Sequence, residues 1–115
     1  MYEKKIEVEI RNPLEYGMQI FSGKWTLRVL CILDEKEVLR YSELRKELNN
    51  ITDAVLATTL KDLIKHKMII RTPYDEIPPR VEYSLTEKGQ SLIPILNSID
   101  DWAKPYYEKD IKLID

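Results

Sequence analysis

The chain has 115 residues and a formal net charge of only −2, although 33% of its residues are charged. This length fits one domain over residues 1–115, and a hydrophobic fraction of 43% is enough to form its core. A strongly basic composition would by itself indicate a nucleic-acid partner, whereas here such a claim depends on where the positive charges lie. One Cys, one His and three Gly form no recognised catalytic, phosphate-cradling or metal-ligand motif, so we expect no enzyme, cofactor or metal site.

The single cysteine, Cys31, cannot form an internal disulfide and therefore predicts a reducing compartment. The start of the chain lacks the apolar core of a signal peptide, and no run approaches the roughly 20 apolar residues that cross a bilayer. These observations favour a cytoplasmic protein with no membrane partner. We expect Cys31 to be buried and inert, because no sequence neighbour would stabilise its thiolate.

An arm and two helices are expected first. Residues 1–12 carry alternating charges and are interpreted as an N-terminal arm. Pro13 suits the first turn of a helix, and Ser22-Gly23 ends that helix. The apolar stretch 24–33 predicts a second, mostly buried helix, which ends in the polar residues that follow.

The middle of the chain has the outline of a helix-turn-helix. Residues 38–41 are interpreted as a short strand. Ser42 is the expected N-cap of a helix over 43–48. Asn49-Asn50 supplies a turn, and Thr52 caps a further helix that reaches about residue 67. The apolar stripe of this further helix consists of Leu56, Leu60 and Leu63.

The pattern then changes to that of strands. Residues 68–72 and 81–85 predict two strands joined by the proline-stiffened loop 73–80. Thr86 opens a final helix, which we expect Pro105 to end. The order of these elements predicts an α+β fold, a winged helix-turn-helix with helices around a small antiparallel β-hairpin wing.

Several stretches carry a resemblance to a known family. They are Ser22-Gly23-Lys24-Trp25, residues 40–44, residues 50–52 and above all Pro78-Pro79-Arg80-Val81-Glu82-Tyr83-Ser84-Leu85-Thr86, continued by Gly89 and residues 94–96. In these stretches, within a match over about residues 12–103, the chain resembles the HxlR-type family of bacterial winged-helix transcriptional regulators, relatives of the MarR group. The resemblance implies a homodimeric, sequence-specific DNA-binding regulator, with residues 87–115 as a dimerisation helix and tail.

One departure from the family limits what the resemblance implies. Members often carry a Cys-Pro pair before the first helix, and in some of them this cysteine senses oxidants or electrophiles. Here the pair is Asn12-Pro13. Redox sensing at this position is therefore not expected.

The fourth helix is the candidate recognition helix. If its leucines face inward, Ala54, Thr58, Lys61 and Lys65 face outward at about 100° per residue. Small residues at the start and lysines further on suit a helix that enters the major groove and contacts phosphates with its later turns. The alternative is an ordinary solvated face.

The wing is the second candidate contact. Two prolines restrict its loop, and an arginine at the tip suits a narrow minor groove. Asp75 and Glu76 oppose this role unless they brace Arg71 or Arg80; the alternative is a purely structural hairpin. The predicted DNA-binding residues are Lys24, Arg40, Ser42, Thr52, Ala54, Val55, Thr58, Lys61, Lys65, Arg71, Pro79 and Arg80.

Two further residues receive structural interpretations. Trp25 opens an apolar helix and is expected to pack against the core, with Lys24 beside it able to reach a phosphate. His66 lies between two lysines and has no Cys or carboxylate partners at ligand spacing, so it is expected to be solvated or weakly phosphate-facing.

The last helix predicts a dimer interface, because it offers more apolar area than one small wing can cover. The alternative is that its side chains only cover the core of the monomer. The predicted interface residues are Leu92, Ile95, Leu96, Ile99, Trp102 and Tyr106.

The leading hypothesis is therefore a homodimer that binds a (pseudo)palindromic operator in double-stranded DNA. Residues 40–80 contain eight Lys or Arg and six Asp or Glu, a mild positive excess. The alternative is a winged-helix protein–protein interaction module without DNA binding, which the near-neutral charge and Asp75-Glu76 favour. No residue pattern identifies a small-molecule effector.

Overall fold

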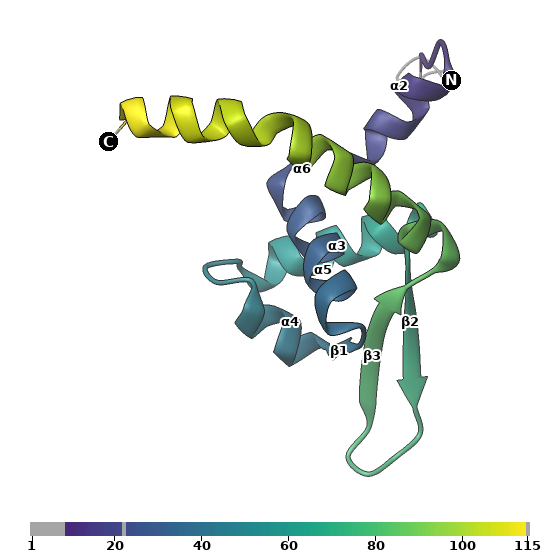
Figure 1. The fold of residues 1–115 in the computed structure, drawn as a ribbon. Coiled ribbons are helices and arrows are strands. Elements are labelled where there is room, and N and C mark those ends of the chain that lie inside the picture. The colour runs from purple at the N-terminus through teal and green to yellow at the C-terminus, as the bar shows by residue number, and fades with distance from the viewer. Residues whose placement is uncertain (1–8, 22, 115) are drawn as a thin grey trace.

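The computed structural model of the chain describes residues 9–21 and 23–114 (Figure 1). Most of the predicted arm, residues 1–8, lies outside the described residues, as do Ser22 and the end of the predicted tail, Asp115. The α+β architecture is the predicted one. Its elements are α2 (Pro13–Met18), the 3-10 helix η1 (Gln19–Phe21), α3 (Lys24–Lys36), β1 (Leu39–Arg40), α4 (Tyr41–Glu47), α5 (Asp53–Lys65), β2 (Ile69–Tyr74), β3 (Arg80–Leu85) and α6 (Glu87–Ile114).

Side chains at the helix starts explain where α2 and α5 begin. The Asn12 side chain accepts the backbone N–H of Glu15 at 2.9 Å, so this part of the predicted arm is an N-cap for α2. Thr52 Oγ1 accepts the N–H of Val55 at 3.2 Å, as the sequence predicts for α5. Both caps satisfy amide groups that have no partner inside the helix.

The prediction that Ser42 caps α4 is wrong. This helix begins two residues earlier than predicted, at Tyr41, and Arg40 occupies the N-cap position in an extended conformation. The carboxylate of Glu43 accepts the backbone N–H of Arg40 at 2.8 Å. The Glu43 carboxylate therefore satisfies the amide of the N-cap residue itself, which is a different interaction from the one predicted for the Ser42 hydroxyl.

The core lies where α3, α4 and α5 pack on one another and on the base of the sheet. The leucine stripe predicted for α5 is buried, and so are Leu44 and Leu48 of α4. Thr59, a buried polar residue, donates its hydroxyl to the Val55 carbonyl at 2.8 Å and is thereby satisfied. The core residues are Ile20, Val29, Leu30, Leu33, Leu39, Leu44, Leu48, Ile51, Leu56, Leu60, Leu63, Met68, Ile69 and Tyr83.

The three strands form an antiparallel sheet in the order β1-β3-β2. The register of β2 and β3 pairs Ile69 with Leu85 at the base and Tyr74 with Arg80 at the far end. The prediction that Tyr74 lies in the loop is wrong, because Tyr74 is the last residue of β2, and the loop shortens from residues 73–80 to residues 75–79. In Figure 1 this hairpin projects away from the helices as a wing.

The last helix, α6, is longer than predicted, because it continues through both Pro94 and Pro105 to Ile114. A proline removes one backbone hydrogen bond to the carbonyl four residues earlier. For Pro105 that residue is Asp101, which is exposed, so water can satisfy its carbonyl. Figure 1 shows the C-terminal half of α6 running out beyond the rest of the chain.

A compact joint fixes the start of α6 to the end of α5. The Thr86 hydroxyl donates to the Lys67 carbonyl at 2.6 Å, and it accepts the backbone N–H of Gly89 at 3.0 Å. The Lys88 ammonium donates to the carbonyl of His66 at 2.9 Å. The part of the chain described here contains no helix that is both long and apolar enough to cross a membrane.

Candidate nucleic-acid interface

The outer face of α5 is exposed as the periodicity predicts. Ala54, Val55 and Thr58 lie in its first turns, and Lys61 and Lys65 follow toward its end. All five side chains are exposed, whereas the leucine stripe on the other side is buried. The helix therefore presents a surface of small side chains that continues into a row of ammonium groups.

A polar cluster bridges the turn between α4 and α5. The Arg45 guanidinium lies 3.2 Å from the carboxylate of Asp53 and donates to the carbonyl of Ile51 at 3.4 Å. The Tyr41 hydroxyl donates to the Asp53 carboxylate at 3.3 Å. Partial burial of its hydroxyl and the nearby Asp53 carboxylate raise the pKa of Tyr41, so the hydroxyl stays protonated as a donor.

This cluster is the part of the candidate site that sequence reasoning missed. Asp53 stands in the first turn of α5, where a carboxylate interacts favourably with the helix dipole. The pairing of Asp53 with Arg45 and Tyr41 joins two helices, so no periodicity within either helix could reveal it. The available signal was an acid directly after the Thr52 cap.

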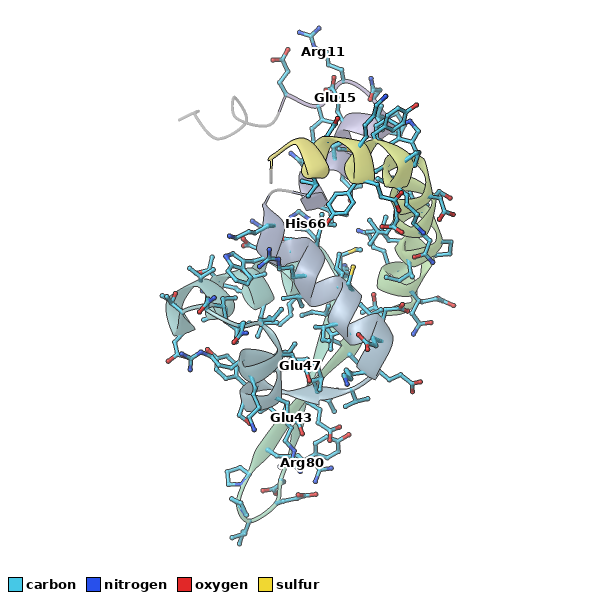
Figure 2. The ribbon with its side chains drawn as sticks, turned by 60° about the vertical axis from the view of Figure 1, so that its left-hand side comes forward. Arg11, Glu15, Glu43, Glu47, His66 and Arg80 are labelled. Atoms are coloured by element: carbon cyan, nitrogen blue, oxygen red, sulfur yellow. The ribbon has the colours of Figure 1, made fainter. Side chains whose placement is uncertain are left out.

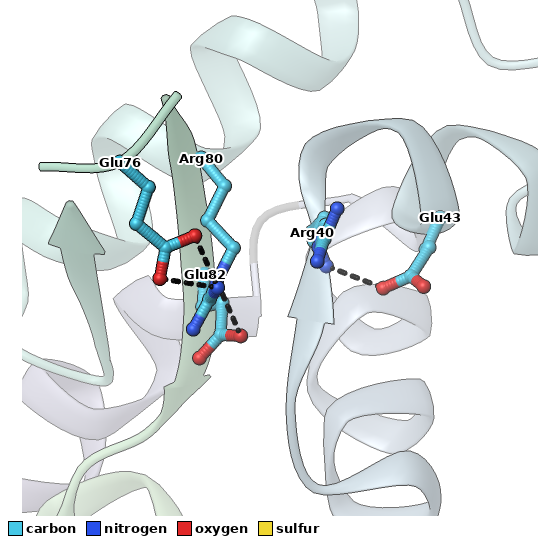
Figure 3. Close-up of polar contacts among 5 residues, drawn as sticks. All are labelled: Arg40, Glu43, Glu76, Arg80 and Glu82. Carbon is cyan, nitrogen blue, oxygen red and sulfur yellow. Dashed lines mark hydrogen bonds and ion pairs between the residues drawn. The ribbon is translucent and has the colours of Figure 1, made fainter. Parts of the chain in front are cut away.

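The wing holds Arg80 between two carboxylates (Figure 3) and against an aromatic ring. Its Nη1 lies 2.6 and 2.8 Å from the two carboxylate oxygens of Glu76, and its Nε donates to Glu82 at 3.2 Å. The guanidinium carbon lies 4.1 Å from the centre of the Tyr74 ring. The expectation that an acid of the loop braces an arginine is met by Glu76 and Arg80.

The two carboxylates favour the charged form of Arg80. Desolvation lowers the pKa of Arg80, but the carboxylates of Glu76 and Glu82 outweigh it and raise that pKa above its ordinary value. Only 26% of the side chain is exposed. The contacts with Glu76, Glu82 and Tyr74 therefore fix the position of the Arg80 guanidinium.

The second wing arginine faces the other way. Arg71 pairs with Tyr83 in the sheet, and Arg80 pairs with Tyr74. Because side chains alternate along a strand, Arg71 and Arg80 lie on opposite faces of the ribbon. Arg71 and Pro79 are both exposed.

The remaining predicted contacts lie on α3 and at the start of α4. The Lys24 ammonium lies 5.1 Å from the centre of the Trp25 ring, which packs partly buried against the core as predicted. A surface groove of about 310 Å³ joins Trp25 to Leu48 and Asn49 at the end of α4. Lys24 therefore begins the helix that borders the turn between α4 and α5. Of the others, Arg40, Ser42 and Thr52 are exposed.

The expectation that Cys31 is buried is wrong. Within α3 the buried residues are Val29, Leu30 and Leu33, and a rotation of about 100° per residue turns Cys31 away from them. Partial desolvation raises the pKa of the Cys31 thiol, and the carboxylates of Asp34 and Asp100 raise it further. The residue is exposed, yet its thiolate is disfavoured.

A continuous apolar surface lies away from the wing, on α2 and α6. Trp102 is 70% exposed and Tyr106 57% exposed, so neither packs on the core of this chain. Ile95 and Ile99 are also exposed, while Leu92 and Leu96 are partly buried. Sequence reasoning missed the contribution of α2, which adds the exposed Leu14 and Met18.

The two helices enclose a groove of about 340 Å³, lined by Leu14, Met18, Ile95 and Ile99 among others. Figure 2 shows Arg80 and Glu43 toward one end of the molecule and Arg11 and Glu15, beside α2, at the opposite end. The apolar surface of α2 and the wing therefore lie at opposite ends. A partner on the apolar surface of α2 leaves the wing free.

Comparison with known proteins agrees with this architecture. A model of the HxlR-like helix-turn-helix family matches residues 20–111. An uncharacterized helix-turn-helix transcriptional regulator of Methanothermobacter thermautotrophicus is 44% identical over 93 residues, which cover 81% of this chain and 70% of the relative.

Solved structures share the fold. A protein of Porphyromonas gingivalis W83, described as a MarR-family transcriptional regulator, is 35% identical with a TM-score of 0.72. The match covers 84% of this chain and 97% of that one. The redox regulator HypR in its oxidized form is 31% identical with a TM-score of 0.73, and the match covers 82% of this chain and 96% of HypR.

Proposed function

The chain belongs to the HxlR-like helix-turn-helix family, and from this premise we propose that it is a sequence-specific DNA-binding transcriptional regulator that acts as a homodimer. The observation that carries the proposal is the exposed face of α5. Its first turns bear Ala54 and Thr58 and its later turns Lys61 and Lys65, beside a wing that projects from the body.

In this proposal α5 enters the major groove, which is wide enough for one helix. Small side chains in the first turns let the helix approach the base edges closely. Val55 offers an apolar contact to a thymine methyl group, and Thr58 offers a hydroxyl. Lys61 and Lys65 reach the phosphates that border the groove, and the wing lies against the adjacent minor groove.

The near-neutral charge of the chain is compatible with this role because several acids near the proposed contact surface have partners. Asp53 pairs with Arg45, and Glu76 pairs with Arg80. Glu43 accepts a backbone amide at the start of α4. These contacts reduce the repulsion between the carboxylates and phosphates, while Lys61 and Lys65 stay exposed.

The homodimer is proposed from the apolar surface of α2 and α6. A helix of 28 residues is about 42 Å long, and its outer half bears Trp102 and Tyr106, which are exposed and receive no cover from the core that the structure describes. Exposed apolar area of this kind marks an interface, and a twofold pair is the commonest way to cover it. A twofold dimer carries two copies of α5, so the operator is proposed to be (pseudo)palindromic, with half-sites about one helical turn or more apart.

A salt-titrated gel-shift experiment tests the proposal. The logarithm of the affinity for a random-sequence duplex should fall linearly with the logarithm of the salt concentration, because bound lysines release counterions from phosphates. Binding that is absent, or that does not change with salt, would instead support the alternative, a winged-helix module that binds a protein partner.

A further inference from the structure

We infer that Glu76 is a specificity-determining residue of the wing, because its carboxylate withholds the Arg80 guanidinium from DNA phosphates. This inference rests on the proposed DNA-binding function. It concerns the contact group of Arg80, Glu76, Glu82 and Tyr74, which we call the arginine clamp; Figure 3 shows its three charged members.

The clamp occupies most of the binding capacity of Arg80. Nη1 is shared by both oxygens of Glu76 at 2.6 and 2.8 Å, and Nε is used by Glu82 at 3.2 Å. One face of the guanidinium lies over the Tyr74 ring. An arginine has five N–H donors, and the two at Nη2 are left for DNA. The face of the guanidinium that points away from Tyr74 is also left.

The charge of the clamp works against a phosphate. Two carboxylates surround one guanidinium, so the group carries a net charge of about −1 at neutral pH. A phosphate that approaches Arg80 meets this net negative charge and competes with Glu76 for Nη1. Neutral acceptors, such as the base edges in the minor groove, can accept from Nη2 while the clamp stays closed.

The two glutamates have different roles because they lie on different elements. Glu82 belongs to the central strand β3, opposite Arg40 of β1 and Thr72 of β2, so the sheet fixes it. Glu76 lies in the loop of the wing and is about half exposed. Glu82 and Tyr74 are therefore positioning residues, and Glu76 is the residue that controls access of phosphate to Nη1.

The chain offers a matched control one residue away. Glu76→Gln and Asp75→Asn each remove one negative charge from the same exposed loop, but the ion pair with Arg80 belongs to Glu76. Any effect of bulk charge appears in both variants. An effect of the released guanidinium appears in Glu76→Gln alone.

The experiment measures the affinity of the full chain for a random-sequence duplex and for a duplex recovered by selection, each over a range of salt. Compared with Asp75→Asn, Glu76→Gln should bind the random duplex about threefold more tightly and steepen its salt dependence by about one unit. The affinity ratio between selected and random duplex should fall. In an Arg80→Ala background, the difference between the two substitutions should vanish.

Two results would overturn the inference and can be told apart. If the parent binds DNA but Glu76→Gln and Asp75→Asn behave alike, Arg80 is not withheld, and the proposed function stands. If the parent binds neither duplex in a salt-dependent manner, the proposed function and this inference fall together.

Discussion

Gly89 packs its Cα directly against the backbone carbonyl oxygen of Met68, and a Cβ at position 89 would overlap that oxygen. This contact joins the first turn of α6 to the residue that precedes β2. The hydroxyl of Thr86 bonds to the neighbouring Lys67 carbonyl. The proposed dimer helix is thus fixed at one joint to the end of α5 and the base of the wing.

Gly89→Ala should therefore destabilise the protein, by about 1–3 kcal/mol, because the backbone of Met68 must move to admit the methyl group. Urea unfolding followed by circular dichroism measures the change. The control is Gly17→Ala in α2, where the added Cβ meets no atom within 4 Å. That variant should be neutral or more stable by up to about 1 kcal/mol, because alanine favours a helix. Equal stability of the two variants would mean that the joint tolerates a methyl group.

Substitutions on α5 should separate base contacts from phosphate contacts. Lys61→Ala should weaken binding to selected and random duplexes by similar factors and reduce the salt slope by about one unit. Lys104→Ala, which removes an exposed lysine from α6, is the control and should leave the slope unchanged. Thr58→Ala should lower affinity for the selected duplex by about 1–3 kcal/mol and alter base preference. A Thr58 variant that loses affinity equally for all duplexes would contradict a base contact.

Ile99→Asp should dissociate the homodimer, because it places a charge in the apolar surface of α2 and α6. Sedimentation at micromolar concentration should show the parent at about twice the 13.6 kDa mass of the chain, and the variant at the mass of one chain. Asn97→Asp adds the same charge to an exposed position on another face of α6 and should remain dimeric. A parent protein that sediments as a monomer would remove the model of two half-sites.

Cys31 should react slowly with iodoacetamide at neutral pH, although it is exposed. Desolvation, Asp34 and Asp100 raise the pKa of its thiol, so the reactive thiolate forms only at higher pH than in free cysteine. The rate of alkylation should accordingly rise at higher pH than the rate for free cysteine. Affinity for DNA should not change when mild thiol oxidants are added. This expectation differs from the redox regulation that the name of HypR ascribes to that protein. Reversible loss of binding in the parent, but not in Cys31→Ser, would contradict this account.

Helical periodicity predicted the core well and local boundaries less well. The stripe of Leu56, Leu60 and Leu63 is buried because burial of an apolar face follows the period of the helix. The cap of α4 was missed because the helix begins at Tyr41, which places Ser42 inside the first turn and leaves Glu43 to accept the amide of Arg40. Pro105 was expected to end α6, but an exposed helix loses only one solvated hydrogen bond there.

Contacts between different helices and strands could not be predicted from the sequence. Cys31 stands in an apolar run, and only the orientation of α3 against the core turns it outward. The link of Arg45 to Asp53 crosses a turn. The acids of the wing were expected to brace an arginine, but the choice of Arg80 over Arg71 depends on the register that puts the two on opposite faces.

Selection of bound sequences from a random duplex library would decide whether the protein reads DNA sequence as a dimer. We expect enrichment of one motif made of two inverted half-sites about one helical turn or more apart, because the two recognition helices of a twofold dimer read it. Recovered sequences that show no enrichment over the starting library, from protein that is folded and dimeric, would contradict it. The winged-helix module that binds a protein partner would then be the better account.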